Sequence, residues 1–127
     1  MSNYDLEEDV LLKFQIYLSI IFIFTLIVSI SLSYNSMMDY EGKNKIYSDD
    51  EALNILRINR IISFLVAFGF VLINVFDKNV KEKYDFDIGS ADLQIAASVI
   101  TLVSSLIVLY VAFNNNSSII SNENPEI

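Results

Sequence analysis

Hydrophobic residues in this chain are gathered into three long blocks, and polar, mostly acidic stretches separate them. The last block, 93–113, is about 21 residues long without a charge, and as a helix it covers the roughly 30 Å of bilayer hydrocarbon. The first block, 14–34, is similar, whereas the middle block, 61–76, is shorter and needs residues 53–59 to complete a span. Three such blocks predict three transmembrane helices, because a helix satisfies its own backbone groups in lipid.

Capping residues define where these helices begin. Asp5 opens an acidic run that suits a helix N-terminus, and Ser48 with Glu51 three residues later forms a capping box. Ser90 precedes the third apolar block in the same way. The predicted helices are, in order, about 6–34, 49–83 and 91–113.

The expected fold is therefore all-α, a three-helix transmembrane bundle with up-down-up topology. Residues 1–113 form a single membrane domain, and residues 114–127 form a polar, flexible tail. The second helix is expected to be the longest and to protrude from the bilayer. The acidic N-terminus lacks the basic region of a signal peptide, which favours retention of the first span.

Composition excludes several kinds of chemistry. The 127 residues include no Cys and no His, which removes thiol nucleophiles, histidine acid–base catalysis and zinc sites built from these residues. The acids lie outside the apolar blocks, so we expect no enzyme, no cofactor and no metal site. A net charge of -8 disfavours nucleic acid as a partner and suits basic protein surfaces.

Small and weakly polar residues recur every three or four positions within the apolar blocks, a spacing that lets helices approach closely in lipid. The residues expected at helix–helix contacts are Thr25, Ser29, Ser33, Ser63, Ala67, Asn74, Ala97, Thr101 and Ser104. Arg57 and Arg60 share a face of the second helix with three of them. That face is either a polar track for an ion or a packing face with two arginines that extend to the membrane interface.

Membrane orientation is left open by the positive-inside rule. The N-terminal side would carry Lys13, Lys78, Lys81 and Lys83, and the opposite side would carry Lys43, Lys45, Arg57 and Arg60. The two sides thus share the eight basic residues equally.

The third block has a further feature. Its sequence, LQIAASVITLVSSLIVLYVAF, resembles segments of small membrane proteins of nucleocytoplasmic large DNA viruses. The resemblance rests on Leu93, Gln94, Ala97, Ser98, Leu106, Ile107, Leu109, Tyr110 and Val111. It implies a virion component in the internal membrane beneath a capsid. The abundance of Ile, Asn, Tyr and Phe fits an AT-rich genome, which many of those viruses have.

These observations favour a non-enzymatic, structural integral membrane protein that anchors or scaffolds a larger assembly. Its expected partners are the lipid bilayer and other membrane or capsid-type proteins, in a homo- or hetero-oligomer. A small oligomeric channel or holin-like pore is the alternative, with the Arg60 face lining water. An accessory subunit of a membrane complex fits the same sequence.

Overall fold

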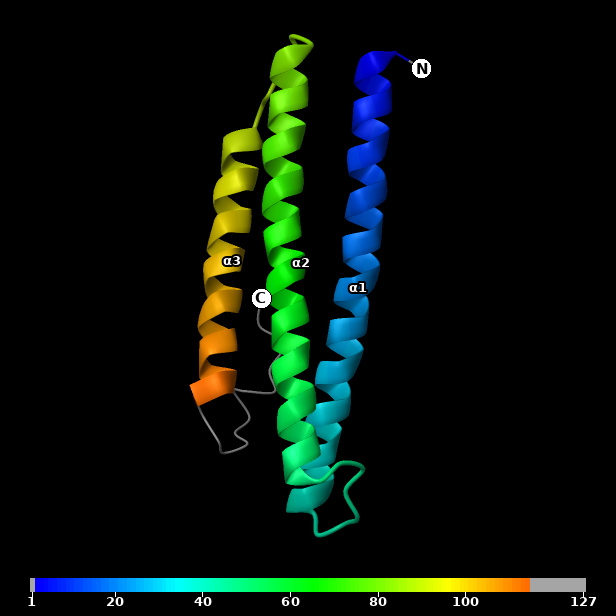
Figure 1. Cartoon of the computed structure of the whole chain (residues 1–127), viewed down its shortest axis with the longest axis vertical. Helices are drawn as coiled ribbons and strands as arrows, with labels where there is room; N and C mark the ends of the chain where they lie inside the picture. The colour runs from blue at the N-terminus through cyan, green and yellow to red at the C-terminus, as the bar shows by residue number, and fades with distance from the viewer. Residues whose placement is uncertain (1, 115–127) are drawn as a thin grey trace.

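The computed structural model describes residues 2–114 and contains three α-helices in this range: α1 (Asn3–Tyr40), α2 (Asp49–Lys83) and α3 (Ala91–Asn114). The chain runs along α1, returns along α2 and runs back along α3, so consecutive helices are antiparallel (Figure 1). The predicted all-α fold is confirmed, and each helix is long and apolar enough to cross a membrane. Most of the predicted tail, 115–127, lies outside the described residues.

The expectation that the second helix is the longest was wrong, because α1 has 38 residues and α2 has 35. α1 begins earlier than predicted, since Ser2 rather than Asp5 is its N-cap. The Asp5 amide donates to Ser2 Oγ over 3.1 Å, and the Ser2 amide donates back to Asp5 Oδ2 over 3.3 Å. This reciprocal capping box satisfies amides that the helix itself leaves free.

α1 also ends later than predicted, at Tyr40 rather than near Tyr34. The polar residues after Tyr34 suggest a loop, yet the next one, Asn35, is helical and buried because its side chain holds the loop that follows α1. The helix stops where Gly42 adopts a left-handed φ of 72°. The Lys43 amide then donates to the Met38 carbonyl over 2.9 Å, which closes the last turn.

The start of α2 at Asp49 agrees with the prediction. Ser48 Oγ accepts from the Glu51 amide over 3.2 Å, as an N-cap does. The Glu51 carboxylate bonds to the Ser48 hydroxyl, at 3.1 Å, instead of reaching the Ser48 backbone. Asp49, Asp50 and Glu51 all lie in the first turn, where the helix dipole favours negative charge.

The charged residues indicate where the bilayer lies along the bundle. On one side Asp77 follows the charge-free run 61–76, and Asp92 precedes α3's apolar run. On the other side Arg57 of α2 is level with the end of α3, since its Nε donates to the Ala112 carbonyl over 3.1 Å. α2 covers about 30 Å between Arg57 and Asp77, which matches the hydrocarbon thickness. The ends of α1 and α2 outside these levels protrude from the membrane.

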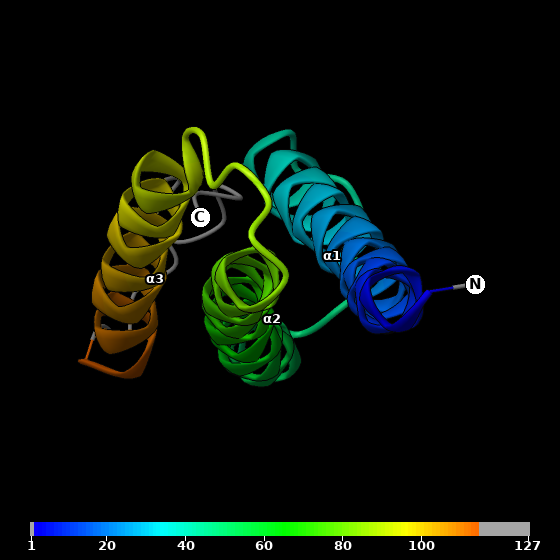
Figure 2. The ribbon, with the colours of Figure 1, turned by 90° about the horizontal axis from the view of Figure 1, so that it is seen from above.

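α2 is the central helix, and α1 and α3 lie on either side of it (Figure 2). Leu32, Leu56 and Ala112, one from each helix, form a buried cluster near the end of α3. At the α1–α2 contact Gly69 is in close contact with the side chain of Leu18. α1 and α3 make few contacts with each other, so a groove remains between them over α2.

Candidate functional site

A buried polar contact joins α1 to α2. Asn59 is 3% exposed, and its Nδ2 donates to the Thr25 carbonyl and to Ser29 Oγ, both over 3.2 Å. Thr25 and Ser29 are themselves 4% and 3% exposed. The small side chains of α1 therefore let Asn59 reach the α1 backbone. Sequence reasoning identified Thr25 and Ser29 but missed Asn59, although an Asn inside an amphipathic span is a signal of such a bond.

On α3 the buried small residues are spaced by seven: Ala91, Ser105 and Ala112 are at most 5% exposed, and Ser98 is partly buried. This heptad spacing is that of helices packed at a shallow crossing angle. Of the residues expected there, Thr101 and Ser104 are partly buried and Ala97 is exposed. The heptad of small residues was the missed signal.

The remaining predicted positions divide between interior and surface. Ser63 and Ala67 of α2 are buried, at 3% and 2% exposure. Asn74 is partly buried, and its Nδ2 donates to the Gln94 carbonyl of α3 over 3.4 Å. Ser33 is exposed, one residue beyond the buried Leu32.

The two arginines differ in their surroundings. Arg57 is partly buried; besides its bond to the α3 backbone, its guanidinium lies 5.3 Å from the centre of the Phe113 ring. Arg60 is 2% exposed, and it lies one turn closer to the bilayer centre. Ser63 and Ala67, on the same face, are buried within this chain. The face proposed as a polar track is thus packed in the single chain.

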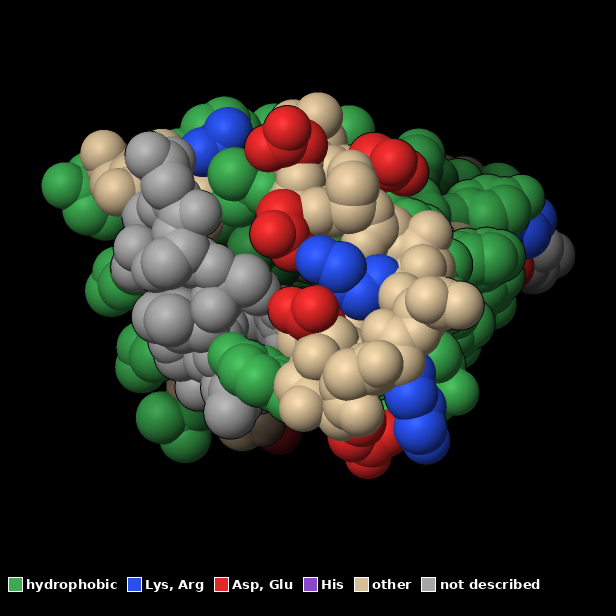
Figure 3. Space-filling model, turned by 90° about the horizontal axis from the view of Figure 1, so that it is seen from below, with side chains coloured by type: hydrophobic (Ala, Val, Ile, Leu, Met, Phe, Trp, Pro, Cys, Tyr) green, Lys and Arg blue, Asp and Glu red, His purple; other side chains and the backbone are tan. Residues whose placement is uncertain are grey.

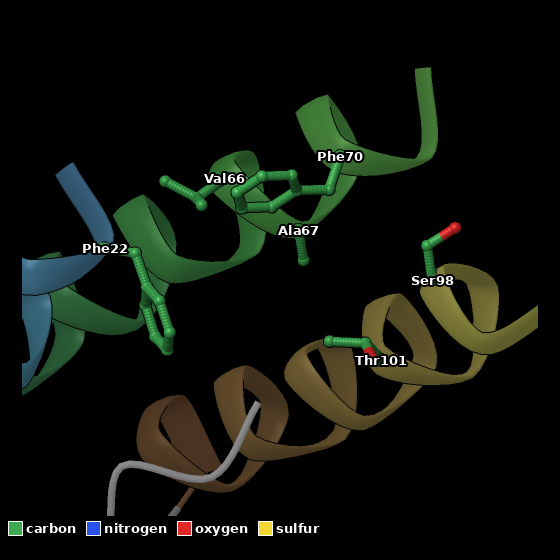
Figure 4. A pocket seen from close by; sticks show the side chains of 6 residues that line it. All are labelled: Phe22, Val66, Ala67, Phe70, Ser98 and Thr101. Atoms are coloured by element: carbon green, nitrogen blue, oxygen red, sulfur yellow. The ribbon is translucent and has the colours of Figure 1, made fainter. Parts of the chain in front are cut away.

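An apolar slot of about 260 Å³ lies in the groove between the outer helices. Figure 4 shows its lining, in which Phe22 of α1 and Ala67 of α2 point into the space facing α3. The other lining residues are Val66, Phe70, Ser98 and Thr101. Both hydroxyls bond carbonyls of α3 itself, Ser98 Oγ to Ile95 and Thr101 Oγ1 to Ala97. The slot is therefore apolar in effect.

A polar vestibule of about 530 Å³ continues the groove toward the membrane face near the N-terminus. It shares Ser98 and Thr101 with the slot, so the two cavities are contiguous. Its polar lining comes from all three helices: Glu8, Gln15, Asn74, Asp77, Lys81 and Gln94. The groove is apolar at its inner end and carries amides and charges of both signs at its outer end.

The charged groups of the vestibule lie outside the hydrocarbon levels and interact directly. Lys81 Nζ pairs with Asp77 Oδ2 at 2.9 Å. Glu8 of α1 faces this pair. Burial raises the pKa of Glu8 to about 7, and both the hydrogen bond between Glu8 and Asp77 and the negative charge of Asp77 contribute to this rise. Glu8 Oε1 is buried and accepts no hydrogen bond within the described residues. A carboxyl oxygen in that position is an available acceptor.

At the opposite end, a helical hairpin formed by the end of α1, the loop 41–48 and the start of α2 projects from the membrane. Asn35 binds both backbone groups of Tyr47: its Oδ1 accepts from the Tyr47 amide over 2.8 Å, and its Nδ2 donates to the Tyr47 carbonyl over 3.3 Å. The Tyr47 hydroxyl also lies 3.0 Å from Ser31 Oγ. These bonds fix the loop against α1.

Charged side chains surround the end of this hairpin (Figure 3). Lys45 lies between two acids, 2.9 Å from Asp49 and 3.6 Å from Asp39. The hydrogen bond to Asp49 raises the pKa of Lys45, and the charges of both acids add to this effect. Lys43 pairs with Glu41 at 3.1 Å. The hairpin thus ends in an acidic surface held by ion pairs. Beside it, Met37, Tyr40 and Ile46 expose 45%, 76% and 57% of their surfaces.

The fold and these sites define an integral membrane protein with three spans, an amphiphilic groove on one side of α2 and, beyond the bilayer, a helical hairpin whose loop is hydrogen-bonded to α1. Within residues 2–114, no group of three or more acids is placed to hold a metal ion. Comparison of the chain with protein-family models, with curated proteins and with solved structures gives no match.

Proposed function

We propose that this protein is a non-enzymatic structural membrane protein that anchors or scaffolds a larger assembly. The observation that carries the proposal is the hydrogen-bonded hairpin, which extends past the end of α3 and presents exposed apolar side chains to water. α2 alone extends about 12 Å from Asp49 to Arg57 beyond the bilayer. A protruding, preorganised surface of this kind suits protein contacts, because little conformational entropy is lost on binding.

The chemistry of the hairpin indicates what its partner is like. Met37 and Tyr40 lie three residues apart and share a face of α1, and exposed aromatic and Met side chains are typical of contact surfaces. Between residues 36 and 56 there are five acids and two lysines. The partner is therefore a protein with a basic surface that surrounds an apolar centre.

The setting we propose is a viral particle with an internal membrane, where such a protein would link bilayer and capsid. The resemblance of residues 93–113 to small virion membrane proteins supports this setting. The absence of Cys and His from the whole chain supports a non-enzymatic role. Mass spectrometry of purified particles is the direct test of the location.

The scaffold role is tested by photo-crosslinking in native membranes. A photoreactive phenylalanine replaces Tyr40, and a matched variant carries it at Phe24, which is 63% exposed within the apolar part of α1. We expect one discrete protein adduct from position 40 and only lipid adducts from position 24. Met37→Ser with Ile46→Ser should reduce the adduct at position 40 several-fold.

The pore alternative is tested with the purified protein in liposomes. A scaffold gives no ion flux above that of empty liposomes. Conductance whose charge selectivity changes on Arg60→Glu, together with no discrete adduct at position 40, would overturn the proposal.

A further inference from the structure

The groove between α1 and α3 has the polarity profile of a membrane lipid. Its vestibule lies at the membrane face, where Asn74 and Gln94 meet and Lys78 pairs with Asp92 at 2.6 Å. From there the apolar slot runs toward the bilayer centre. Along α2 the distance from Asp77 to Val66 is about 16 Å, which is close to the depth of one leaflet, about 15 Å.

We propose that this groove binds a phospholipid whose headgroup carries a primary ammonium, such as phosphatidylethanolamine, with an acyl chain in the slot. This inference is independent of the scaffold proposal, which rests on the opposite end of the molecule.

Charge complementarity selects this headgroup. Lys81 and the amides of Gln15 and Asn74 supply donors for a phosphate, and the carboxyl of Glu8 supplies an acceptor for an ammonium. Of the vestibule's polar atoms, Glu8 Oε1 is a buried acceptor to which no group within residues 2–114 donates. A quaternary ammonium has no N–H to donate, and a glycerol headgroup has no positive charge. A primary ammonium is the headgroup that matches both.

The lining of the groove suits a lipid. The slot, of about 260 Å³, is lined by apolar side chains that can pack against the methylene groups of an acyl chain. Because α1 and α3 make few contacts with each other, a lipid can enter laterally from the leaflet.

The test is native mass spectrometry of the full-length protein in detergent, titrated at pH 8 with phosphatidylethanolamine, phosphatidylcholine or phosphatidylglycerol of identical acyl chains. We expect phosphatidylethanolamine to bind about tenfold more tightly than the other two, as one charge-assisted hydrogen bond implies. Equal binding of all three lipids, or a preference for phosphatidylglycerol, would refute the assignment.

Three variants locate the binding site. Glu8→Gln keeps the size of the side chain and should abolish the preference, so that phosphatidylethanolamine binds no more tightly than the other two lipids. Glu82→Gln, at an exposed carboxylate on the same end of α2, should leave the preference unchanged. Ser98→Leu fills the slot and should weaken the binding of all three lipids to the same extent. Three results would contradict the proposed site. The preference for phosphatidylethanolamine could survive in Glu8→Gln, or it could be lost in Glu82→Gln as much as in Glu8→Gln. The third is that Ser98→Leu binds all three lipids as tightly as the unchanged protein does.

Discussion

The contact between Asn59 and α1 makes a quantitative prediction about what holds the bundle together. Replacing Asn59 by Ala removes two interhelical hydrogen bonds, each 3.2 Å long. In membrane proteins such bonds contribute about 0.6 kcal/mol on average and up to about 1.7 kcal/mol. Two of them therefore stabilise the α1–α2 pair by about 1–2 kcal/mol. The Thr25 carbonyl loses an extra donor, and the buried hydroxyl of Ser29 loses a partner on α2.

Asn54 on the same helix provides the matched control, because it is exposed and the substitution is identical. Ala has a higher helix propensity than Asn by up to about 0.7 kcal/mol, and this gain is common to both variants. The difference between the two variants thus isolates the contact. We expect Asn59→Ala to be less stable than Asn54→Ala by about 1–2 kcal/mol, which changes the unfolding equilibrium about 5- to 30-fold.

Reversible unfolding in mixed micelles measures this difference. Because the chain contains no Cys, single cysteines introduced at the ends of α1 and α2 can carry a donor and an acceptor dye without side reactions. Energy transfer then reports separation of the two helices as the fraction of denaturing detergent rises. Identical midpoints and slopes for the two alanine variants would show that the Asn59 bonds contribute nothing.

Three further predictions concern helix contact, capping and membrane insertion. Gly69→Val should destabilise the α1–α2 contact by about 1–3 kcal/mol, because a Cβ would lie 2.7 Å from Leu18 Cδ1; Leu18→Ala in the same chain should recover most of the loss in the energy-transfer assay. Ser48→Ala should cost about 1 kcal/mol and speed hydrogen exchange in the first turn of α2, whereas Ser33→Ala, at an exposed position, should not; equal exchange in both would contradict the capping role. Alkaline carbonate extraction should leave the protein in the membrane pellet, and its release into the supernatant would refute three spans.

Much of the fold could be predicted because the signals for it are local. The length of an apolar block determines whether it crosses a bilayer, and a capping residue acts on amides within its own turn. The start of α2 at Asp49, capped by Ser48, was predicted in this way. Asn35 was wrongly assigned to a loop, because its polar side chain accepts a hydrogen bond from the amide of Tyr47, 12 residues further along the chain. A polar residue that satisfies a distant backbone is indistinguishable, in sequence, from one that faces water.

The groove could not be predicted, because in lipid a hydrophobic side chain gains little by facing a neighbouring helix rather than an acyl chain. The pattern of apolar residues therefore indicates that a helix is in the membrane but not which of its faces packs. Only small and polar residues carry that information. On α3 they form two sets of positions on adjacent parts of the helix surface, one containing Ala97 and Thr101 and the other Ser105 and Ala112. The structure buries the second set against α2, which turns the first toward the groove. The residues expected to pack against a helix thus line the cavity in which we place a lipid.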